Sequence, residues 1–186
     1  APGSSHTSTS ATLGASSGKW YFEYKCTSAG QYQWVGALNI STGAFAGDTD
    51  VFSNSNSWSY SAYSGWKWQG GGFWNGSSYG TSWATGTSHI IGCALDLDNN
   101  KIYWSYNGTW QASGDPAAGT NAAFTNLTEG YYVPCHSGAS SAGVFNFGQD
   151  SSFAGEETAQ GNQDDNEIGD FYYDVPDGFL ALCASN

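Results

Sequence analysis

The sequence predicts an all-β protein, an antiparallel two-sheet β-sandwich with a short C-terminal extension, and three observations lead to this prediction. The 186 residues include 26 Gly, 9 Trp, 12 Tyr and 10 Phe but only 11% charged residues. Short aromatic and β-branched runs alternate with Gly, Ser and Asn clusters, which is typical of strands and turns. No segment has the apolar stripe and capping residues of an amphipathic helix. The length suits one domain with an ordered extension.

The clearest element is the stretch from Ile90 to Gln111, which predicts two strands and two reversals. Alternate residues are apolar before and after Asp98–Asn100, at the two-residue period of a strand. Asp and Asn hydrogen-bond their own backbone and tolerate left-handed conformations, so this triplet predicts a hairpin turn. Asn107-Gly108 is a strong signal for a second turn. The whole stretch therefore predicts a meander.

Further strands are expected at both ends of the chain. Trp20–Lys25 alternates Trp20, Phe22 and Tyr24 with Tyr21, Glu23 and Lys25 on the opposite face. Tyr32–Leu38 predicts a second strand. Near the C-terminus, Pro176 and Gly178 predict a turn before a short final strand, Phe179–Cys183.

Three motifs resemble the SPRY family. The leucine-aspartate strand followed by an aromatic strand ending in Asn-Gly, within Ile90–Gln111, resembles the signature hairpin of SPRY domains. GKWYFEY at Gly18–Tyr24 resembles the family's early tryptophan-and-glutamate strand, and VFNFGQ at Val144–Gln149 resembles its closing strand. The resemblance implies a concanavalin-like, jelly-roll sandwich.

A second resemblance concerns the last 26 residues. Gly161–Asn186 is similar to the segment that trails SPRY-like domains in large bacteriophage structural proteins. We therefore expect a lead-in segment at 1–16, a SPRY-like sandwich at 17–149, and an acidic loop with an apolar extension at 150–186. The expected location is a virion surface or the extracellular space.

Charge distribution excludes several partners. The net charge is −12, no Lys or Arg follows Lys101, and nine of the 16 carboxylates lie between Asp150 and Asp177. Nucleic acids are poor partners, because their binding depends on Lys and Arg. No apolar run approaches the roughly 20 residues that span a bilayer, so we expect no membrane insertion. The chain has no Met, so we expect a removed leader or a portion of a longer polypeptide.

Cysteine spacing argues against a structural zinc site. Cys26, Cys93, Cys135 and Cys183 are isolated from one another, whereas zinc sites usually draw two ligands from one tight turn. Four cysteines allow three disulfide pairings, between which the sequence does not choose. We favour free thiols if the protein assembles in bacterial cytoplasm.

The aromatic stretch from Trp58 to Gly80 is the candidate binding region. Its rings either fill the sandwich or remain exposed as a platform for sugars or a protein partner, and we expect a mixture. We expect Trp68 to be exposed on a loop, because Lys67 and Gln69 flank it. The full set of candidate ligand-binding residues is Asp48, Asp50, Trp66, Lys67, Trp68, Gln69 and Trp74.

Catalysis has little support in the sequence. Asp48 with Asp50 and Asp96 with Asp98 are carboxylate pairs of the kind that glycosidases use. Turn chemistry already explains Asp96 and Asp98, which we expect to face outward. No nucleophile elbow surrounds Ser88-His89. We expect no enzymatic activity, with a glycosidase as the weakest of the hypotheses.

The acidic loop is a weak candidate for calcium, and no other cofactor is expected. Its oxygen ligands lie close together but lack the spacing of an EF-hand, so a solvated acidic loop is favoured. The candidate calcium ligands are Asp164, Asp165, Glu167 and Asp170.

The apolar tail is a candidate assembly element. Phe179, Leu180 and Leu182 need a face to bury against, either in their own domain, which we favour, or on a neighbouring subunit. The second alternative would make the protein a homo-oligomer.

Two functions are therefore expected, from different classes. The first is non-enzymatic adhesion by a virion fibre, spike or capsid decoration, in which edge loops bind a host-surface glycan or protein. The second is a structural subunit that contacts other virion proteins or its own copies in a lattice and has no separate ligand.

Overall fold

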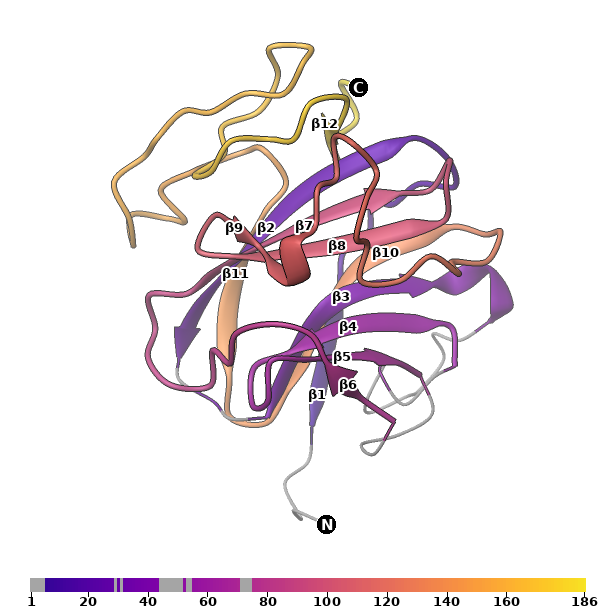
Figure 1. Cartoon of the computed structure of the whole chain (residues 1–186). Helices are drawn as coiled ribbons and strands as arrows, with labels where there is room; N and C mark the ends of the chain where they lie inside the picture. The colour runs from indigo at the N-terminus through magenta and orange to yellow at the C-terminus, as the bar shows by residue number, and fades with distance from the viewer. Residues whose placement is uncertain (1–5, 29, 31, 44–51, 53–54, 71–74) are drawn as a thin grey trace. The chain divides into compact units, whose positions relative to one another are not determined.

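The computed structural model describes residues 6–28, 30, 32–43, 52, 55–70 and 75–186. Their regular structure is almost entirely strand, with two short 3-10 helices, η1 (Ile40–Thr42) and η3 (Gln111–Ser113). None of these helices has the length and hydropathy needed to cross a bilayer. The strands are β1 (Thr7–Ser10), β2 (Lys19–Ser28), β3 (Gln33–Asn39), β4 (Ser57–Ser61), β5 (Trp66–Gln69), β6 (Ser77–Ser78), β7 (Ile90–Asp96), β8 (Lys101–Tyr106), β9 (Thr109–Trp110), β10 (Tyr132–Gly138), β11 (Ala142–Asn146) and β12 (Leu180–Ala181) (Figure 1).

The strands form two sheets (Figure 1). One has the order β1-β10-β3-β4-β5-β6, and the other has the order β11-β2-β7-β8-β9 with β12 added beside β2. Each sheet is the centre of a compact unit. The first unit comprises residues 1–16, 27–87 and 128–142, and the second comprises residues 17–26, 88–127 and 143–186.

The predicted hairpin is present. Strands β7 and β8 pair antiparallel from Asp96 with Lys101 to Ile91 with Tyr106. Asn100 in the first turn has a φ of 59°, and Asn107 and Gly108 in the second have φ of 46° and 77°. Two consecutive positive φ values are what a tight type I′ turn requires, and Asn and Gly reach them at low cost.

The first sheet contains two strands that the sequence prediction missed. Within the expected lead-in segment, β1 pairs antiparallel with β10. Strand β10 contains Pro134, which argues against an interior strand. Pro134 nevertheless lies opposite Ala37 of β3, and its carbonyl accepts a hydrogen bond from the Ala11 amide at 2.8 Å. Pro134 thus keeps a hydrogen bond through its carbonyl, although it has no N–H to donate.

The C-terminal extension covers one face of the second sheet. Tyr21, Glu23 and Lys25 alternate along β2, so their side chains lie on the same face, and all three are buried. Each contacts the extension: Tyr21 meets Phe171 edge to face at 5.1 Å between ring centroids, and Lys25 Nζ donates to Glu157 Oε1 at 2.6 Å. The contacts of Glu23 are described below.

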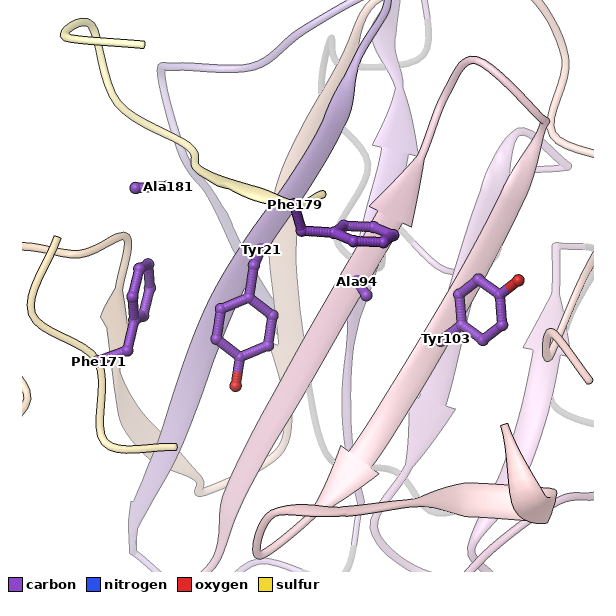
Figure 2. Packing of buried hydrophobic residues seen from close by; sticks show 6 residues of the cluster. All are labelled: Tyr21, Ala94, Tyr103, Phe171, Phe179 and Ala181. Carbon is purple, nitrogen blue, oxygen red and sulfur yellow. The ribbon is translucent and has the colours of Figure 1, made fainter. Parts of the chain in front are cut away.

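An aromatic cluster forms beneath the extension (Figure 2). Phe171 and Phe179 from the extension pack with Tyr21, Ala94 and Tyr103 of the sheet. Burying an aromatic side chain of this size stabilises the fold by about 2–3 kcal/mol. The extension is therefore part of the core of the second unit.

Glu23 ties the extension to the sheet by hydrogen bonds. Its Oε1 accepts from the Tyr173 amide at 2.9 Å and from the Tyr21 hydroxyl at 3.1 Å. Its Oε2 accepts from the Tyr172 amide at 3.0 Å and from Asn146 Nδ2 at 3.2 Å. Burial raises the pKa of Glu23, and the four hydrogen bonds offset part of that effect.

Candidate functional site

The predicted binding segment Trp66–Gln69 is a strand and not a loop, which corrects the expectation from the sequence. It is β5, and it pairs antiparallel with β4 from Trp58 with Gln69 to Tyr60 with Lys67. Because side chains alternate along a strand, Trp66 and Trp68 share one face while Lys67 and Gln69 share the other. Lys67 and Gln69 therefore do not flank the Trp68 ring as predicted.

Trp66 is more exposed than Trp68. Trp68 is half-buried and packs against a cluster that includes Trp34, Leu38 and Val133. An added Cβ at Gly76 would lie 2.5 Å from the Trp68 ring, so this glycine allows the backbone to approach the indole. Trp66 keeps 40% of its surface exposed, and its ring centroid lies 6.2 Å from that of Trp68.

Two tyrosines lie at the same end of the first sheet. Tyr63 is in the turn between β4 and β5 and is 55% exposed. Its ring stacks on Tyr32, which comes just before β3, with centroids 5.6 Å apart and planes at 27°. Trp34 of β3 pairs with Ser61 of β4, so the start of β3 and the β4–β5 turn are neighbours. We call Tyr32, Tyr63, Trp66 and Trp68 the aromatic edge.

Lys67 belongs to the opposite face of β5. Its Nζ lies 5.8 Å from the centroid of the Tyr79 ring, which is cation–π distance. Partial burial lowers the pKa of Lys67. The aromatic edge itself consists of neutral side chains, so its chemistry is that of ring faces, two tyrosine hydroxyls and two indole N–H groups. Such rings bind the apolar faces of sugars or anchor in the pockets of a protein partner.

The remaining candidate binding residues, Asp48, Asp50 and Trp74, lie outside the described residues. Within the aromatic stretch, Trp58 and Tyr60 are buried while Trp66 is exposed, so the stretch contains both kinds of ring. The two tyrosines of the aromatic edge were not among the predicted site residues. No local pattern marks them, because each lies beside the end of a strand and they meet only in the folded sheet.

The carboxylate pair at the hairpin has structural contacts, and the expectation that both members face outward is wrong for Asp96. Asp96 is buried, its Oδ1 accepts from the Asn99 amide at 3.0 Å, and its Oδ2 lies 3.6 Å from Lys19 Nζ. Asp98 Oδ1 accepts from the Gly18 amide at 2.7 Å. These contacts fix the turn and the start of β2.

Two of the four calcium candidates, Asp164 and Asp165, are engaged within the chain. Asp164 accepts hydrogen bonds from the amides of Asn166, Ile168 and Ala181, and these lower its pKa against the opposing effect of burial. Asp165 Oδ2 accepts from the Gly178 amide at 2.7 Å. Among the described residues, no three His, Cys, Asp or Glu side chains form a group that could bind a metal. Glu167 and Asp170 are therefore not part of such a group either. In the part of the chain that the structure describes, no disulfide joins the four cysteines.

The candidate assembly residues lie in the second unit. Phe179 and Leu182 are buried, and Leu180 is half-buried on β12, which pairs parallel with β2 at Trp20 and Tyr21. The tail therefore buries its main apolar side chains within its own chain. Its role in oligomerisation stays a prediction.

Two sheets, antiparallel apart from the pair of β12 with β2, and exposed aromatic residues at one end of the first sheet define the chain as an all-β protein. The SPRY domain model matches residues 19–150. The crystal structure of the SPRY domain of human HERC1 is similar, with a TM-score of 0.56 and 19% sequence identity over 75% of this chain and 79% of that chain. The chain belongs to the SPRY family.

Family membership confirms the predicted fold class, an all-β antiparallel two-sheet sandwich. SPRY domains are generally non-catalytic modules that bind proteins. The likeness to the HERC1 domain concerns the fold alone. The residues after 150, which cover β2 in this chain, lie outside the family match.

Proposed function

We propose that this chain is a non-enzymatic binding module of a bacteriophage virion, which attaches to a host-surface protein or glycan through the aromatic edge. One observation carries the proposal. Trp66 and Tyr63 are exposed at one end of a sheet in which Trp58 and Tyr60 of the neighbouring strand are buried. Exposed Trp and Tyr are the residues most often found at the energetic centre of an interface.

Several properties support the location on a virion. The trailing segment resembles those of phage structural proteins, and the net charge of −12 favours solubility at high local concentration. The low content of Lys also argues against partners with phosphate backbones. A protein partner agrees with the usual role of SPRY domains.

The proposal is tested by binding of the purified chain to bacterial envelope extracts and to glycan arrays, with light scattering to measure its mass. An adhesin binds a saturable component and remains a small particle. A chain that binds nothing and forms large assemblies is instead a lattice subunit, the alternative function. Deleting residues 179–186 is a poor test of assembly, because Phe179 and Ala181 are core residues. Leu180→Lys is the better variant, since Leu180 is half-buried on β12.

A further inference from the structure

A groove of about 560 Å³ lies in the second unit, and no residue of the aromatic edge lines it. One side consists of the turn that follows β9 and η3, and the other consists of residues 174–177 of the C-terminal extension. Its volume is in the range of ligand-binding clefts. Residues 174–177 lie outside the family match, so the family model does not account for this wall of the groove.

The lining combines an apolar surface with three carboxylates. Trp110, Pro116, Val175 and Pro176 supply apolar surface, and Pro116 is buried while Trp110 is half-buried. Asp115, Asp174 and Asp177 are exposed and add negative charge. The lining contains no cationic side chain.

No cationic side chain of the described residues pairs with these carboxylates. Asp174 and Asp177 make no hydrogen bond or ion pair with the described residues, and Asp115 uses only Oδ1, which accepts from the Ala118 amide at 3.0 Å. Lys101 is the last cation of the sequence, and its ammonium donates to the Gly119 carbonyl at 2.7 Å.

The segment that carries Asp174 and Asp177 is anchored on both sides. The Tyr173 amide donates to Glu23, and Phe179 is buried in the cluster under the extension. Between them, the Phe179 amide donates to the Pro176 carbonyl at 3.0 Å, which closes a turn. A wall fixed in this way loses little conformational entropy when a ligand binds.

The geometry points to a second binding site in this groove, for an arginine- or lysine-bearing peptide segment of a protein partner. The aliphatic stem of such a side chain packs on Pro116, Pro176 and Val175, while its cationic head lies among the carboxylates and near the Trp110 ring. A metal ion is a poorer occupant, because among the described residues no three acidic, His or Cys side chains are grouped closely enough to bind one.

The test is an NMR titration of the 186-residue chain with three blocked pentapeptides in about 0.15 M salt, where charges farther apart than roughly 8 Å are screened. The probes are Ac-Gly-Arg-Ala-Arg-Gly-NH2, the same peptide with citrulline in place of both arginines, and the same peptide with glutamate. Citrulline keeps the shape of arginine and removes its charge. The arginine peptide is expected to shift the Trp110 indole resonance and the amides of residues 174–177.

Two double variants separate the groove from general electrostatics. The double variant Asp174→Asn/Asp177→Asn is expected to lower the affinity for the arginine peptide by about tenfold, because both removed charges belong to the groove. Glu129→Gln/Glu156→Gln removes the same charge at exposed positions outside the groove and is expected to change affinity by less than about twofold. The inference is overturned if the citrulline peptide binds equally well, if both double variants behave alike, or if the shifted resonances lie elsewhere. None of these outcomes bears on the proposed envelope binding through the aromatic edge, which is tested separately.

Discussion

Replacing Glu23 by Gln tests whether one buried carboxylate holds the C-terminal extension on β2. The carboxylate accepts four hydrogen bonds, from the Tyr172 and Tyr173 amides, the Tyr21 hydroxyl and Asn146. The NH2 half of a glutamine amide donates and cannot accept, so the two donors that face it lose their partner, while the other two keep the carbonyl oxygen. Each buried donor without a partner costs about 1–3 kcal/mol.

The expected loss is about 3 kcal/mol of unfolding free energy, because removing a buried charge offsets part of the cost of the two orphaned donors. For a chain of this length that corresponds to a fall in Tm of roughly 6–12 °C. Urea titration followed by tryptophan fluorescence measures the loss, and Glu156→Gln, an exposed glutamate of the same unit, is the control. Hydrogen exchange should accelerate at the Tyr172 and Tyr173 amides. A variant within about 0.5 kcal/mol of wild type would refute the role assigned to Glu23.

Two further predictions concern the first unit. Burial lowers the pKa of His136 from 6.5 to about 4, so the unfolded chain binds the proton more tightly and stability falls as pH drops from about 6.5 to 4. The 2.5-unit difference corresponds to about 3 kcal/mol, so urea titrations across this pH range should show wild type losing about that much stability relative to His136→Gln; parallel curves would exclude the effect. Gly36→Ala should destabilise by about 2–3 kcal/mol, because the new Cβ would lie 1.9 Å from the Trp58 carbonyl oxygen and 2.8 Å from Ser59 Cα. Thermal unfolding measures this loss, and an unchanged Tm would mean that β3 and β4 separate easily.

The strands that the sequence predicted are those whose signal is local. Alternation and Asp, Asn and Gly at the turns place β7, β8 and the turns after each of them. Strand β10 escaped prediction because Pro134 and small polar residues hide its pattern, and its ladder depends on pairing with β1 and β3. Those partners are distant in sequence.

The candidate site was predicted only in part, for a similar reason. Trp66 and Trp68 were both candidates, but local sequence does not reveal that Trp68 packs on Leu38 and Val133 while Trp66 is exposed. The neighbouring Lys67 and Gln69 suggested that Trp68 is exposed, whereas strand alternation places both of them on the opposite face. Tyr63 and Tyr32 meet through the pairing of β3 with β4.

The role of the C-terminal extension depends on still longer separations. The amides of Tyr172 and Tyr173 reach Glu23 across about 150 positions of sequence. The sequence predicts an apolar tail that buries its side chains either in its own domain or on a neighbouring subunit, and local pattern does not choose between the two. The buried alternation of Tyr21, Glu23 and Lys25 on β2 provides that face.

The proposed function is tested most directly by measuring binding to bacterial envelope extract. The double variant Trp66→Ala/Tyr63→Ala is compared with Tyr131→Ala and with wild type. Tyr131 is also exposed but lies just before β10, near the end of β3 that is opposite Tyr32. Loss of central interface aromatics typically costs about 2 kcal/mol or more each, so the double variant should bind at least about 100-fold more weakly while keeping the wild-type Tm. The Tyr131 variant should bind as wild type does. Equal binding by all three proteins would contradict the assignment of the aromatic edge as the binding surface.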